Sequence, residues 1–183
     1  MKVRDRRRRA GTPPGRSELT SLGARCLAGN RAKQDGGGAS VSRGALRAAA
    51  QSSVRFARNE AGGAGGGLAL YGGASASLGG SGLEFSRNAA RVGGGLSLVD
   101  SQAAVLSRAV LDGNTAYSEG GAIYALAFSA PAGLSVSGAA SLGARGNSAG
   151  STGGGATSYG ARWTVDGEIV FSGASGVYSG ADV

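Results

Sequence analysis

The feature that most constrains the fold of this chain is a short motif that returns along nearly its whole length. A large apolar residue, an Asn three positions later and a Gly-rich turn seven or eight positions after the Asn recur together at intervals of 26 to 33 residues. The motif occurs in segments 27–41, 56–70, 85–98, 111–125 and 144–158, and a weaker copy at 171–183 has Ala174 in place of the Asn. Self-similarity at a period of about 20–50 residues is typical of solenoids and related arrays, in which each repeat buries its core only against its neighbours.

The residues between the motifs predict strands. About twenty residues of short alternating segments, such as LALYG and ASASLGG, separate one Gly turn from the next Asn. Alternation over four to six positions, punctuated by Gly, is typical of strands rather than of a helix. We therefore predict three strands and three turns per repeat, forming triangular coils stacked about 4.8 Å apart. The predicted fold is all-β: a right-handed, single-stranded parallel β-helix of about six short coils over residues 17–183, after a disordered Arg-rich tail at residues 1–16.

Each column of the motif has a physical reason. The large apolar residues are expected to point inward and stack on one another, and they are Leu27, Phe56, Phe85, Leu111 and Phe171. The asparagines are expected to form a ladder in which each amide bonds to backbone or to the next Asn, because buried backbone at a turn needs partners. This ladder comprises Asn30, Asn59, Asn88, Asn114 and Asn147. The turn glycines are expected at φ > 0, which only Gly adopts without steric cost, and they are Gly38, Gly67, Gly95, Gly121 and Gly155.

The repeat carries two short motifs together, FxxN and GGA[ILV]. FxxN occurs at 56–59 and 85–88, and GGAI at 120–123, with near matches at 66–68 and 94–96 where a third Gly replaces Ala. This pair of motifs resembles the repeats of the chlamydial polymorphic outer membrane proteins. The resemblance covers roughly residues 27–183. It implies the β-helical passenger of an autotransporter, displayed at the cell surface and linked to adhesion.

The charge is concentrated at the N-terminus. Residues 1–33 hold ten of the nineteen basic residues and two of the eleven acids, so the remainder is neutral. An Arg run without an apolar segment after it is not typical of a secretory signal peptide. The sequence has no apolar stretch of 18 residues, so no membrane-spanning helix is predicted. Such a run could contact nucleic acid or act as a nuclear address, but a solvated tail is the favoured interpretation. We expect no nucleic-acid partner beyond weak contacts of this tail, and the residues themselves leave the compartment open.

The residue types argue against an enzyme. The chain has no His and one Cys, which removes Ser-His and Cys-His nucleophiles and the usual zinc sites. The acids do not stack: the column of Asp100 otherwise contains Gly72, Ala127 and Gly160, so no pair of carboxylates suited to acid–base hydrolysis is predicted. The Gly turns lack the Asp of calcium-binding solenoids, and no phosphate-binding Gly loop occurs. We therefore predict no catalytic residues, no metal and no cofactor.

One outward column is a candidate binding surface. If the first and third residues after each Gly turn point inward, the fourth points outward, and that column is the apolar stripe Tyr71, Val99, Leu126 and Tyr159. Aligned apolar side chains outside a fold could contact a glycan or a protein partner. The favoured alternative is that the strand turns a corner there and leaves these side chains partly buried.

The predicted function follows from these observations. It is a non-catalytic, cell-surface or extracellular repeat domain with a structural or adhesion-type binding role. The alternatives are a fragment or decayed repeat protein without independent function, and a relative of β-helix polysaccharide lyases or hydrolases that lacks an active site. Because end coils offer unpaired backbone groups, self-association through the open ends of the stack is also expected.

Overall fold

The computed structural model describes residues 18–22, 25–48, 51–138 and 140–176. The disordered tail predicted for residues 1–16 and the end of the weak repeat after residue 176 lie outside the described residues. In the described part every element is a strand, and no helix could span a membrane.

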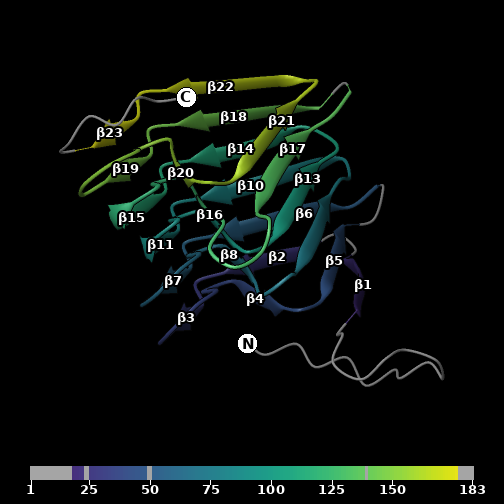
Figure 1. Cartoon of the computed structure of the whole chain (residues 1–183), viewed down its shortest axis with the longest axis horizontal. Coiled ribbons are helices and arrows are strands. Elements are labelled where there is room, and N and C mark those ends of the chain that lie inside the picture. The colour runs from purple at the N-terminus through teal and green to yellow at the C-terminus, as the bar shows by residue number, and fades with distance from the viewer. Residues whose placement is uncertain (1–17, 23–24, 49–50, 139, 177–183) are drawn as a thin grey trace.

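The strands form four parallel sheets, which we name A to D (Figure 1). Sheet A contains β1 (Glu18–Leu22), β5 (Ala45–Ala48), β9 (Ser75–Leu78), β13 (Gln102–Val105), β17 (Gly133–Val136) and β21 (Arg162–Val165). Sheet B contains β2 (Arg25–Ala28), β6 (Ser53–Ala57), β10 (Gly82–Ser86), β14 (Ala109–Asp112), β18 (Ser141–Arg145) and β22 (Glu168–Ser172). Sheet C contains β3 (Arg31–Ala32), β7 (Glu60–Ala61), β11 (Ala89–Val92), β15 (Thr115–Glu119), β19 (Ser148–Ala149) and β23 (Ser175–Gly176). Sheet D contains β4 (Ala39–Ser42), β8 (Leu68–Tyr71), β12 (Leu96–Val99), β16 (Ile123–Leu126) and β20 (Ala156–Tyr159).

Successive strands belong to sheets A, B, C and D in turn, so four strands make one coil. Within each sheet a strand pairs in parallel with the strands four places before and after it in the chain. Sheets A, B and C have six strands and sheet D has five, so the described chain makes between five and six coils. The prediction of an all-β parallel solenoid is confirmed, whereas three strands per coil is wrong. Strands of sheet C are as short as two residues, too short to show the alternation by which strands are recognised.

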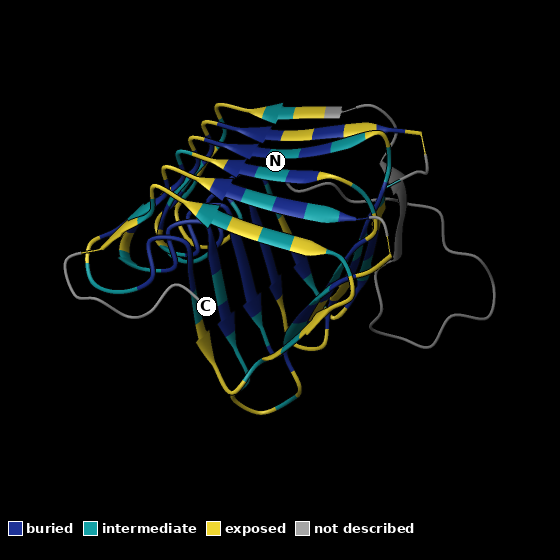
Figure 2. Ribbon diagram, turned by 90° about the horizontal axis from the view of Figure 1, so that it is seen from above, coloured by how far each residue is buried: buried dark blue, intermediate teal, exposed yellow. Residues whose placement is uncertain are grey.

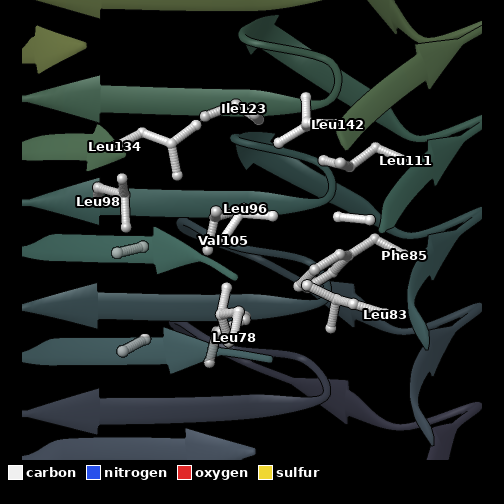
Figure 3. Packing of buried hydrophobic residues seen from close by; sticks show 14 of the residues in the cluster. Leu78, Leu83, Phe85, Leu96, Leu98, Val105, Leu111, Ile123, Leu134 and Leu142 are labelled. Atoms are coloured by element: carbon white, nitrogen blue, oxygen red, sulfur yellow. The ribbon is translucent and has the colours of Figure 1, made fainter. Parts of the chain in front are cut away.

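The core lies inside the coils, between sheets A, B and D. Viewed along the stack in Figure 2, buried residues line the inside and exposed residues gather on outer faces and corners. One coil illustrates the pattern: Phe85 of sheet B, Leu96 of sheet D and Val105 of sheet A are all buried and belong to one cluster (Figure 3). Successive side chains of a strand point to opposite faces, so alternate residues of each strand fill this narrow space.

The predicted apolar column stacks in register along sheet B. Phe56 lies on Phe85 with ring centroids 4.8 Å apart and planes 5° from parallel, and Leu111 continues the column. Ala144 occupies the next position and Phe171 the last. The three central members are buried, while Leu27 and Phe171, at the two ends of the column, are partly buried.

The expectation that the predicted turn glycines have positive φ is wrong, because the left-handed residue is the first Gly of each turn. These first glycines are Gly36, Gly65, Gly93, Gly120 and Gly153, with φ between 62° and 68°. The predicted set, Gly38, Gly67, Gly95, Gly121 and Gly155, is absent from the positive-φ residues. A close approach between coils requires Gly at most of these later positions. A Cβ on Gly38 would lie 2.6 Å from the carbonyl oxygen of Gly67 and 2.9 Å from the Phe56 ring. Gly121 occupies the middle position of its Gly-Gly-Ala turn, and a Cβ there would lie 2.4 Å from the carbonyl oxygen of Gly154.

The third position of the turn is Ala122 in one coil, and the core residue packed beside it is smaller than in the other coils. A Cβ on Gly67 would meet Phe85 of the following coil at 2.7 Å, and one on Gly95 would meet Leu111 at 3.2 Å. The coil that follows Ala122 has Ala144 in the same core column instead of Phe or Leu. The methyl group gained at the turn therefore coincides with a smaller side chain in the core beside it.

Candidate functional site

No group of three or more His, Cys, Asp or Glu side chains among the described residues could hold a metal ion. Cys26 is a free, exposed thiol. The remaining candidates are the Asn ladder, the apolar stripe with its two ends, and one buried carboxylate.

The five predicted asparagines form a continuous ladder at the corner between sheets B and C. Asn88 shows the pattern: its Oδ1 accepts from the backbone N and the Nδ2 of Asn59, both at 3.0 Å. Its own Nδ2 donates to the Phe56 carbonyl and to Asn114 Oδ1, both at 2.9 Å. The same bonds link Asn30 to Asn59 and Asn114 to Asn147. Four of the five asparagines are at most 1% exposed, so the ladder is structural and inaccessible to a ligand.

The residue before each Asn was not anticipated from the sequence. It adopts positive φ in every coil, as Gly29, Arg58, Arg87, Gly113 and Gly146, and Gly173 does the same before Ala174 in the weak copy, with φ between 52° and 67°. The corner between sheets B and C is always two residues long, so its first residue must turn the chain in the left-handed region before Asn enters the ladder. Bulky residues are rare at such φ values. The recurrence of Gly one residue before the Asn, at Gly29, Gly113 and Gly146, could have indicated this left-handed conformation from the sequence.

The apolar stripe is formed by the last residue of each of four strands of sheet D, and these residues lie in register on successive coils. The labels of β8, β16 and β20 follow one another along this sheet in Figure 1. Tyr71 and Tyr159, at the two ends of the stripe, are 38% and 45% exposed, and Val99 and Leu126 between them are half-buried. Leu68 and Leu70, which point inward on the same strand, are buried, and so is Ala69 between them, so β8 is open to solvent only at Tyr71. The stripe is therefore an outer, partly accessible surface with a tyrosine at each end.

A shallow hollow adjoins the stripe at Tyr71. Its lining residues are Lys33, Gln34, Asp35, Gly62, Gly63 and Tyr71. The Oδ1 atom of Asp35 accepts a hydrogen bond of 2.7 Å from the backbone N of Ala64, which anchors the carboxylate. The two glycines keep the floor free of side chains. The hollow combines one aromatic wall with an amine, an amide and a carboxylate.

The opposite end of the stripe has a second aromatic and polar group. The rings of Tyr124 and Tyr159 meet edge to face at 6.1 Å. The Glu119 carboxylate lies beside the Tyr159 hydroxyl, and their interaction raises the pKa of Tyr159. Burial, and secondarily the negative charge of Glu119, raises the pKa of Tyr124. Both tyrosines therefore stay protonated at neutral pH, and Glu119 stands as an acceptor beside them.

Asp100 is a buried carboxylate that clamps a loop of the next coil. Its Oδ1 accepts from the backbone N of Phe128, Ser129 and Ala130 at 2.7–3.0 Å, and its Oδ2 accepts from the Ser129 hydroxyl at 2.6 Å. These bonds hold the pKa of Asp100 well below its usual range. The clamped loop, residues 127–132, presents Phe128 with 85% of its surface exposed. Asp100 thus anchors a loop, in line with the sequence argument that it has no stacked acidic partner.

Comparison of the chain with protein-family models, with curated proteins and with solved structures gives no match. The fold is therefore described by its geometry alone, as a parallel β-solenoid.

Proposed function

We propose that this solenoid is a non-catalytic binding domain that contacts its partner through the apolar stripe. The observation that carries the proposal is the alignment of Tyr71, Val99, Leu126 and Tyr159 on successive coils, outside the core and partly open to solvent. Contiguous exposed apolar surface is typical of interaction sites.

The rest of the architecture supports a rigid display of this surface. Each stripe residue is carried on a strand that is hydrogen-bonded to a neighbouring strand of sheet D. The turn before Tyr71 is joined to the next coil by backbone bonds such as Gly67 N to Gly95 O at 3.1 Å. A rigid platform reduces the conformational entropy lost on binding.

The finer assignment, to a cell-surface repeat with an adhesion-type role, is part of the same proposal. The FxxN and GGAI motifs support it by their resemblance to the chlamydial polymorphic outer membrane protein repeats, in which such coils face the outside of the cell. In this chain those motifs build the ladder corner and the Gly turn next to the stripe.

The proposal is tested by attachment of beads coated with the full chain to cultured epithelial cells. We expect coated beads to attach more than uncoated beads, and the double variant Tyr71→Ser/Tyr159→Ser to lose most of this attachment. Tyr117→Ser is the matched control, because Tyr117 is 69% exposed on sheet C and lies outside the stripe. Attachment at the level of uncoated beads, or equal attachment by the double variant and the control, would contradict the proposal.

A further inference from the structure

The two ends of the stripe carry information about the ligand, because each combines an aromatic ring with fixed polar groups. At one end Tyr71 borders a hollow that contains Lys33, Gln34 and Asp35. At the other end Tyr159 lies against Tyr124 and beside Glu119. Between them run the apolar side chains of Val99 and Leu126.

We propose that the stripe binds an extended, neutral oligosaccharide that runs parallel to the stack axis and spans about four pyranose rings, roughly one per coil. This inference rests on the proposed function of the stripe as a binding surface, and it names the class of ligand.

The spacing of the stripe suits a chain of sugar rings. Neighbouring strands of a sheet lie about 4.8 Å apart, so each coil places one stripe residue at about the length of one pyranose ring in an extended chain. A ligand with this repeat meets an equivalent side chain at every ring from Tyr71 to Tyr159.

The chemistry of the stripe also matches a sugar. A pyranose ring has a face of C–H groups and an edge of hydroxyls, and aromatic side chains provide a flat apolar surface with a polar tip. The stripe offers its apolar side chains to the C–H faces, while Lys33, Asp35 and Glu119 offer donors and acceptors to the hydroxyls. A purely apolar partner would bury these polar groups without hydrogen bonds, which costs free energy.

The charges of the lining residues favour a neutral ligand over an acidic polymer. In the hollow the charge of Asp35 is balanced by Lys33, and Glu119 is the charged group beside Tyr159, so these residues offer a polyanion no net positive charge at either end of the stripe. Asp35 is held in place before binding by its bond to the backbone N of Ala64. Such preorganisation lowers the cost of binding.

The test is calorimetric titration of the full chain with β-1,4-linked hexasaccharides of glucose, N-acetylglucosamine and mannose. We expect saturable binding of at least one of them at about 1 mM or below, with affinity that rises with length up to about the tetrasaccharide and then levels off. Tyr71→Ala, Tyr159→Ala and Asp35→Ala should each weaken binding by at least about fivefold, and Tyr117→Ala should leave it unchanged.

Three outcomes would overturn the inference: no saturable binding by any of the three hexasaccharides, no length dependence, or equal affinity of the Tyr71 and Tyr159 variants and the wild type. The bead assay separates this failure from failure of the proposed function. Attachment that depends on Tyr71 and Tyr159 but is not competed by the hexasaccharides would overturn the oligosaccharide and leave the stripe as a binding surface. Circular dichroism of each variant establishes that it is folded.

Discussion

The Asn ladder predicts that replacing an Asn inside the ladder lowers the free energy of unfolding more than replacing the first Asn does. Asn88→Ala removes the Oδ1 that accepts from the backbone N of Asn59 at 3.0 Å, in a site only 1% exposed. The Nδ2 of Asn59 keeps its 2.7 Å bond to the Leu27 carbonyl, so the backbone N–H is the donor that loses its partner. A buried donor left unpaired costs about 1–3 kcal/mol, and we expect this loss in the free energy of unfolding.

Asn30→Ala is the matched control, because Asn30 is the first Asn of the ladder. Its backbone N and Nδ2 both donate to Asn59 Oδ1, at 3.0 and 2.9 Å. Its substitution removes one side-chain donor and leaves every backbone N–H of the ladder paired. We therefore expect about 0.5–1 kcal/mol, the net contribution of an ordinary hydrogen bond.

Urea unfolding followed by circular dichroism measures both changes, provided that the slope with denaturant stays constant. Hydrogen exchange locates the effect, because the amide of Asn59 should lose protection in Asn88→Ala and keep it in Asn30→Ala. Equal destabilisation by the two substitutions, or a fully protected Asn59 amide in Asn88→Ala, would refute the role assigned to the ladder.

Three further predictions concern the core and the clamped loop. Phe85→Ala should lower the free energy of unfolding by about 3–5 kcal/mol, as other large-to-small core changes do, and a change near zero in urea unfolding would mean that the ring is not packed as described. Ala144→Leu should destabilise by about 1–3 kcal/mol through overpacking against Ala122, and less in an Ala122→Gly background; a double-mutant cycle without coupling would contradict the proposed adjustment of volume. Asp100→Asn should reduce hydrogen-exchange protection of the amide of Phe128 at neutral pH. Because the pKa of Asp100 is lowered in the fold, its contribution is full above the ordinary Asp pKa of about 3.9 and declines as the pH falls below it, so the stability difference between wild type and Asp100→Asn should narrow in acid.

The sequence by itself determined that the chain is a parallel β-solenoid and which residues form its columns, although not the number of strands in a coil. A motif that returns about once per coil places equivalent residues above one another, so Phe56 and Phe85 had to stack and Asn59 and Asn88 had to align. The alternation after each Gly turn likewise predicted an outward column that contains Tyr71. In a solenoid each repeat contacts only its neighbours, so a residue that recurs at the same position of each repeat contacts its own equivalents in the adjacent coils.

Only the tertiary structure decided the features that depend on distances between coils. It put positive φ at the first Gly of each turn and close backbone contact at Gly38, because the approach of the next coil, rather than the turn alone, determines where a Cβ fits. It also gave Asp100 its role, since its partners, including Phe128, lie in a loop of the next coil that breaks the period. The hollow beside Tyr71 arises in the same way, from Lys33 of the preceding coil. Such contacts join residues at non-equivalent positions of the repeat, so the repeat pattern does not predict them.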